Sequence, residues 1–156
     1  MPTVTEGIDS YVSEERAAAY FSVRLYADAW DNATDENRQK ALLMSRVLLD
    51  GHIRWKGRKT DLEQALEWPR AGVDSIGADL IPDAVRVAQM ELALVLLAED
   101  VTAIPETSGF SEIQVNKIRL KIDPNDRRGV IPESVFALVS NLGRREGGCG
   151  TISLGR

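Results

Sequence analysis

Two tryptophans and a proline lie close together in the stretch WKGRKTDLEQALEWPRAG, residues 55–72, which separates two amphipathic segments. Each indole carries a large apolar surface, and Pro69 has a fixed φ that favours an extended conformation at Trp68. We therefore expect this connector, called the clasp below, to pack tightly against the rest of the chain. The residues predicted to form it are Trp55, Gly57, Trp68, Pro69, Arg70 and Gly72.

Helix signals on both sides of the clasp predict a helical bundle. Ser13 and Thr34 are good N-caps, and each is followed by two acidic residues in the first turn. Pro82 suits the first position of a very apolar helix that runs to about Ala98. Shorter helical segments are expected at 61–66 and from Pro132 to about Gly143. The predicted buried faces contain Ala17, Tyr20, Phe21, Leu25 and Trp30; Ala41, Leu42, Ser45, Leu48 and Leu49; and Val85, Ala88, Leu92, Val95 and Leu96.

The segment Ile113–Asp123 has the alternation of a strand. Ile118, Leu120 and Ile122 alternate with Lys117, Arg119 and Lys121, which predicts one apolar and one basic face. Ile113 and Val115 are out of phase with that set, so a bulge or turn is expected near Asn116. The chain offers no obvious second strand, and a lone strand cannot satisfy its backbone hydrogen bonds. Pairing with a neighbouring subunit is therefore expected.

The predicted fold class is mainly α. A helical bundle with the clasp occupies residues 1–100, and residues 101–156 add one strand or β-arm, a short helix and an extended glycine-rich tail. With 156 residues and 44% apolar content, the chain suits a single domain with an extension.

Composition argues against several functional classes. His52 is the sole histidine and Cys149 the sole cysteine, so no histidine cluster, thiolate zinc site or disulfide framework can form within the chain. No nucleophile and base are paired by any known motif, and neither an enzyme nor a cofactor site is predicted. The formal net charge of −5 opposes nonspecific binding to nucleic acid or membranes. No signal peptide or membrane segment is predicted, and the lone cysteine is typical of a reducing compartment.

Two basic clusters leave alternatives open. Arg54, Lys56, Arg58 and Lys59 surround Trp55, so this group could contact DNA while the indole stacks on bases, or Trp55 could simply anchor the core. The basic strand face of Lys117, Arg119 and Lys121 could face solvent, an acidic partner or DNA, and solvent or a protein interface is favoured over DNA.

The order of these segments resembles a family of tailed-phage proteins. An N-terminal AAAYFSVRLYADAW, then WKG, LEWPRAG and IPDAVRVAQMELALVLL are similar to the small head-completion, or head-to-tail adaptor, proteins, some of which carry the label DnaT-like single-stranded DNA-binding protein. The resemblance covers roughly residues 10–100 and is most specific at Trp68, Pro69, Arg70 and Gly72 followed by Ile81, Pro82 and Val85.

That resemblance implies a virion structural protein, made in the host cytoplasm. Such adaptors form a ring, commonly of twelve copies, between the portal and a tail or neck protein, with packaged DNA in the channel. Residues 113–123 would face a neighbouring subunit or the portal, and residues 144–156 would form a docking arm. The interface residues so implied are Ile113, Val115, Lys117, Ile118, Arg119, Leu120, Lys121, Ile122, Arg144, Arg145, Ile152 and Leu154. The alternative function is a single-stranded DNA-binding accessory protein of replication.

Overall fold

The structure, a computed structural model, describes residues 2–103, 112–115, 118–121 and 129–146. These ranges form a small mixed protein of five helices and three two-stranded antiparallel sheets, so the mainly α prediction is confirmed only in part. The elements are α1 (Glu14–Phe21), α2 (Asp28–Asp31), α3 (Asp35–His52), β1 (Ile53–Trp55), β2 (Arg58–Lys59), β3 (Arg70–Ala71), α4 (Asp83–Ala98), β4 (Glu112–Val115), β5 (Ile118–Lys121), α5 (Glu133–Val139) and β6 (Gly143–Arg145).

The helix starts follow local capping chemistry and confirm the sequence prediction. The Ser13 hydroxyl accepts a hydrogen bond from the Arg16 backbone N–H at 3.2 Å, and Thr34 Oγ1 accepts one from Asn37 at 3.2 Å. Pro82 is the N-cap of α4, one position before the one predicted.

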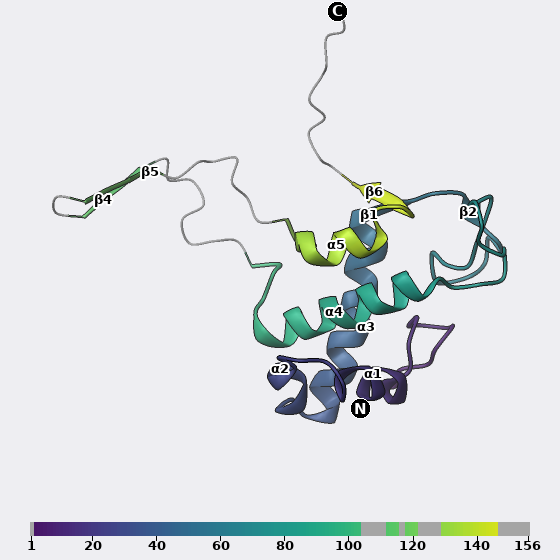
Figure 1. Cartoon of the computed structure of the whole chain (residues 1–156), viewed down its shortest axis with the longest axis horizontal. Helices are drawn as coiled ribbons and strands as arrows, with labels where there is room; N and C mark the ends of the chain where they lie inside the picture. The colour runs from purple at the N-terminus through teal and green to yellow at the C-terminus, as the bar shows by residue number, and fades with distance from the viewer. Residues whose placement is uncertain (1, 104–111, 116–117, 122–128, 147–156) are drawn as a thin grey trace, which may run out of the picture.

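Helix α4 is the centre of the molecule. Its residues Val85, Ala88 and Leu92 belong to one buried cluster, which also holds the clasp tryptophans and α5. Met90, Ala93 and Leu94 belong to a second buried cluster with α1 and α2. In Figure 1, α3 crosses α4, while α5 and α1 lie on opposite sides of α4. The apolar residues all round α4 are therefore explained by burial on two faces. All five positions predicted for α3 are buried.

The predicted continuous apolar face from Ala17 to Trp30 is wrong at Leu25. Helix α1 ends at Phe21, and Leu25 lies in the following connection with 76% of its surface exposed. Phe21 and Trp30 still meet in the core, with ring centroids 4.5 Å apart, because the connection turns back and α2 brings Trp30 towards α1. Helical spacing predicted the right partners but not the turn between them.

The clasp is packed as predicted. Trp55 and Trp68 are 6% and 0% exposed, and their rings meet edge to face at 5.8 Å. The peptide bond between Trp68 and Pro69 is cis. The helical turn expected at 61–66 is absent from this described segment, because the Asp61 carboxylate accepts a hydrogen bond from the Glu63 N–H at 2.9 Å and stabilises a turn instead.

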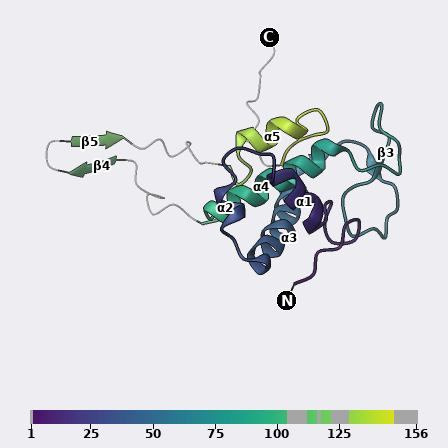
Figure 2. The ribbon, with the colours of Figure 1, turned by 60° about the horizontal axis from the view of Figure 1, so that its bottom comes forward.

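The prediction that residues 113–123 need a strand from a neighbour is wrong. Strand β4 pairs with β5 in one antiparallel hairpin, which lies apart from the helices in Figures 1 and 2. The register joins Ile113 to Leu120 and Val115 to Ile118, so an odd position pairs with an even one. This register explains the phase change that the sequence shows near Asn116. Asn116, Lys117 and Ile122 themselves lie outside the described residues.

The prediction that the docking arm begins at residue 144 is wrong. Arg144 and Arg145 belong to β6, which pairs with β1 of the same chain. Three residues are too few to reveal a strand by periodicity, so the sequence pattern did not predict this one. Ile152, Leu154 and Cys149 lie outside the described residues.

Candidate nucleic-acid interface

The β1–β6 ladder places two arginines directly opposite each other. Ile53 and Trp55 are buried while Arg54 between them is exposed, as strand alternation requires. The antiparallel register pairs Arg54 with Arg144, which is exposed as well. Like charges at opposed positions destabilise a sheet. An arrangement that is locally unfavourable in this way often marks a functional site.

Glycine makes this ladder sterically possible. Gly143 pairs with Trp55, and a Cβ added to it would lie 2.7 Å from Ile53 Cγ2 and 2.9 Å from the Arg54 carbonyl oxygen. The backbone of Lys56 extends the contact by donating to the Leu142 carbonyl at 2.8 Å. Gly143 and Arg144 are thus the residues of this surface that sequence reasoning missed as partners of the basic cluster.

Arg70 stabilises the turn at Gly57, which lies between Lys56 and Arg58. Its buried guanidinium donates to the carbonyl oxygens of Lys56 at 2.7 Å and Gly57 at 2.9 Å. It also forms a 2.7 Å ion pair with Glu67, so its charge is compensated. Gly57 has φ +71°, and a Cβ there would lie 2.3 Å from the Ala71 carbonyl oxygen. The clasp residues therefore fix the backbone on both sides of Lys56.

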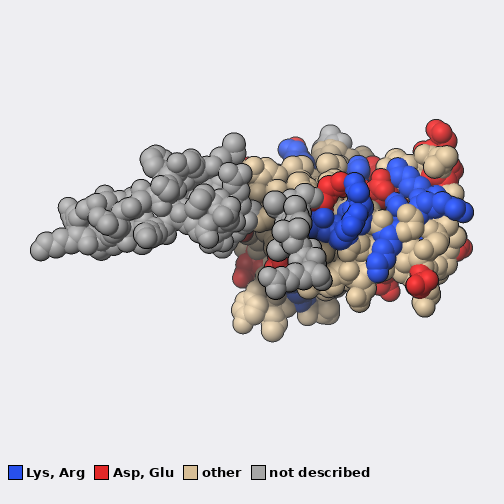
Figure 3. Space-filling model, turned by 90° about the horizontal axis from the view of Figure 1, so that it is seen from above, with Lys and Arg blue, Asp and Glu red and all other residues tan. Residues whose placement is uncertain are grey.

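The four side chains of Arg54, Lys56, Arg58 and Arg144 form what we call the basic surface. All four residues are exposed. Arg54 makes a 2.8 Å ion pair with Glu146, in which both side chains remain about half exposed. Across the described part of the chain, Lys56, Arg58 and Arg144 have no side-chain hydrogen bond or ion pair. Figure 3 shows lysine and arginine side chains gathered over the end of the molecule that contains β1, β2 and β6.

Two neighbouring cations have other roles. Lys59 lies 3.4 Å from the Glu67 carboxylate and donates to the Gln64 carbonyl oxygen. Arg145 forms a 2.7 Å ion pair with Glu133 and lies over the Phe136 ring at 4.5 Å. The structure thus brings together three of the four cations predicted for DNA contact and adds Arg144. Arg119 and Lys121 lie in β5, away from this surface, while Lys117 lies outside the described residues.

The basic surface suits phosphate groups better than bases. Trp55 is a core residue, so its indole is not available to stack on a base. Exposed arginine and lysine side chains on a fixed backbone attract phosphate oxygens without reading base identity.

His52 ends α3 and is half-buried. Within the described ranges, no group of three or more His, Cys, Asp or Glu side chains is arranged to hold a metal ion. None of the helices described is long and apolar enough to cross a membrane.

Comparison with known proteins supports one affiliation. Residues 2–156 match the family described as "Putative DnaT-like ssDNA binding protein". No match was found among curated proteins or among solved structures. Because the match extends over nearly the whole chain, this protein belongs to the DnaT-like ssDNA-binding protein family.

Proposed function

We propose that the protein binds single-stranded DNA through the basic surface. The observation that carries this proposal is the opposition of Arg54 and Arg144 across β1 and β6, a placement that concentrates positive charge. Lys56 and Arg58 extend that charge along the clasp. The chain as a whole is acidic, which opposes nonspecific attraction of DNA, so binding requires such a local concentration of cations. The family description points to the same ligand.

The mode of binding follows from which side chains are exposed. Phosphate contacts provide the affinity, because both clasp tryptophans are buried and cannot stack on bases. Binding should therefore depend steeply on salt and vary little among oligonucleotides of different base composition. A single strand can bend to follow four cations on a short, irregular ladder, whereas a duplex presents phosphates on a stiff cylinder.

Removing two cations of the basic surface is expected to lower the salt dependence of binding. For the double variant Lys56→Gln/Arg144→Gln, the slope of log affinity against log salt should fall in magnitude by about 1.4, since each contacted phosphate of a single strand contributes about 0.7. The measurement is fluorescence anisotropy with labelled oligothymidine, titrated from about 20 to 300 mM NaCl.

The matched control is Arg16→Gln/Lys40→Gln, which removes the same charge elsewhere. Arg16 and Lys40 are exposed but already paired with Glu6 and Glu36. Their loss should leave the salt slope unchanged. If the wild-type protein fails to bind at the lowest salt, or the control weakens binding as much as the double variant, the proposed site is wrong.

We propose a head-to-tail adaptor in the virion as the second candidate function. The β4–β5 hairpin favours it, because its register pairs positions 113 and 115 with positions 120 and 118, all aliphatic in the sequence, and an isolated hairpin is only marginally stable in water. A ring of copies, the portal, a tail or neck protein and the packaged DNA are the partners proposed.

Co-sedimentation with purified portal tests this second function. Replacing residues 112–121 with a Gly-Ser linker of equal length should abolish co-sedimentation, since the hairpin is the proposed contact. The Lys56→Gln/Arg144→Gln variant should still co-sediment, which separates assembly from DNA binding. A wild-type protein that never sediments with portal would contradict the adaptor function.

A further inference from the structure

Three large apolar side chains project from the connection between α1 and α2. Val23, Leu25 and Tyr26 are 86%, 76% and 85% exposed, although each could have been placed in the core. We call these three residues the prong. The prong lies on different elements from the basic surface, so DNA binding does not account for it. Adjacent large apolar residues this exposed commonly mark a protein contact.

The prong is held in one shape by Arg24. The guanidinium of Arg24 binds both carboxylate oxygens of Glu91 on α4, at 2.7 Å each. The same side chain donates to the carbonyl oxygens of Leu25 at 2.5 Å and Tyr26 at 3.2 Å. Tyr26 has φ +60°, an uncommon conformation that these bonds support. Because the prong is already ordered, little conformational entropy would be lost when it binds.

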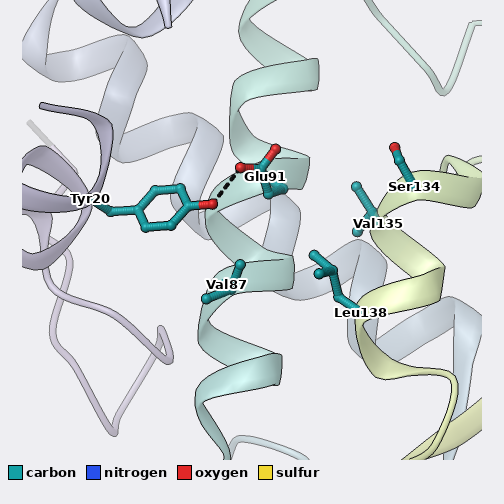
Figure 4. Close-up of a pocket in the computed structure, with 6 residues that line it drawn as sticks. All are labelled: Tyr20, Val87, Glu91, Ser134, Val135 and Leu138. Carbon is teal, nitrogen blue, oxygen red and sulfur yellow. Dashed lines mark hydrogen bonds between the residues drawn. The ribbon is translucent and has the colours of Figure 1, made fainter. Parts of the chain in front are cut away.

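Glu91 also lines a pocket. This pocket has a volume of about 170 Å³ and lies between α1, α4 and α5. Figure 4 shows Val87, Val135 and Leu138 at its apolar part, with Tyr20 directed at the Glu91 carboxylate. The Tyr20 hydroxyl donates to Glu91 Oε1 at 2.6 Å. The volume is large enough for one apolar side chain, which would contact Val87, Val135 and Leu138.

The prong and the pocket are neighbours, because Glu91 contacts residues at both. Its carboxylate binds Arg24 beneath the prong, and the same residue lines the pocket. An interface with two-fold symmetry uses the same patch on both subunits, so a patch that carries both a projection and a cavity meets its basic requirement. The carboxylate is already paired with Arg24 and Tyr20, so covering it would leave no unpaired charge.

We propose that two copies of this chain associate face to face, with the prong of each copy inserted in the pocket of the other. Leu25 is the central contact, since the apolar part of the pocket wall is aliphatic and Leu25 is the middle residue of the prong. Arg24 and Glu91 act as positioning residues that present the prong. The dimer uses the α1–α4–α5 face and leaves the basic surface free.

Analytical ultracentrifugation of the full chain over a range of concentrations tests the proposal. The wild type should show a reversible monomer–dimer equilibrium. Leu25→Asp and Leu138→Asp should each raise the dissociation constant by at least about 30-fold, as expected for a residue at the centre of an interface. The matched control is Leu62→Asp, because Leu62 is 84% exposed in the clasp and should not affect dimerisation. All three positions are exposed, so thermal melts should show that each variant is folded.

Cysteine crosslinking identifies the contact itself. In a Cys149→Ser background, mixing the single variants Leu25→Cys and Leu138→Cys should give an oxidised heterodimer in higher yield than either variant alone. The proposal is overturned if the wild type stays monomeric at every concentration, or if Leu62→Asp raises the dissociation constant as much as the other two variants do. It is also overturned if the protein dimerises but the cysteines at positions 25 and 138 form no crosslink.

Discussion

Replacing Trp68 with alanine is expected to lower the free energy of unfolding by about 3 to 5 kcal/mol, the usual cost of removing a large buried aromatic side chain. Trp68 is fully buried and contacts Trp55 edge to face, so little of the space it leaves can be filled by relaxation. For a domain of this size the melting temperature should fall by roughly 6 to 20 °C. Urea denaturation followed by circular dichroism measures the change.

The variant Trp68→Phe is the control for this prediction. The Trp68 Nε1 atom is buried and has no hydrogen-bond partner among the residues that the structure describes, so phenylalanine removes no such bond while it keeps most of the apolar surface. Its cost should stay below about 2 kcal/mol. If Trp68→Phe destabilises the protein as much as Trp68→Ala, the indole N–H makes a bond that matters, and the packing explanation is wrong.

Asp50 is expected to make the protein less stable as the pH rises through 6. Its carboxylate accepts a 2.6 Å hydrogen bond from the Tyr11 hydroxyl. Burial is the main cause that raises the pKa of Asp50 from 3.8 to about 6 in the folded protein. Burial and the neighbouring Asp50 carboxylate also raise the pKa of Tyr11 well above its ordinary value, so this hydroxyl remains a donor.

The sign follows from the direction of the Asp50 shift. A raised pKa means that the folded state binds the proton more tightly than the unfolded state does. The resulting stabilisation is complete below pH 3.8 and is lost as the pH rises through about 6. A shift of about two pH units corresponds to about 3 kcal/mol.

Asp50→Asn removes this titration while its amide oxygen can still accept from Tyr11. Between about pH 4 and pH 7.5, the stability of the variant relative to wild type should therefore increase by about 3 kcal/mol. Asp100→Asn is the control, because hydrogen bonds from the Thr102 hydroxyl and backbone lower the pKa of Asp100, and its effect should have the opposite sign. A relative stability of Asp50→Asn that does not change with pH would contradict the prediction.

Local signals predicted the helices well for a physical reason. Ser13 and Thr34 cap their helices through bonds that span only three residues, so nearby sequence is sufficient to specify them. The five buried positions of α3 follow from helical spacing alone. Burial of the two clasp tryptophans was equally predictable, because no other placement hides so much apolar surface in a short connector.

The elements that were predicted wrongly depend on contacts between distant residues. The end of α1 is set partly by Arg24, whose ion partner Glu91 lies on α4. The partner of β5 was overlooked because β4 is in the opposite phase, which an antiparallel register allows but alternation along one strand conceals. Arg144 was assigned to a tail because a strand of three residues has no periodicity of its own.

By itself, the sequence determined the helix starts, the buried face of α3, the packed clasp and three of the five predicted positions of α4, because capping and burial act over one or two turns of chain; Val95 and Leu96 of α4 are only partly buried. Only the tertiary structure decided which charges come together. Arg54 and Arg144 are far apart in sequence, and they meet because β6 pairs with β1 in a register that glycine at position 143 permits. Pairing of distant strands depends on the packing of the whole core, and so the place of Arg144 in the basic surface could not be predicted from spacing.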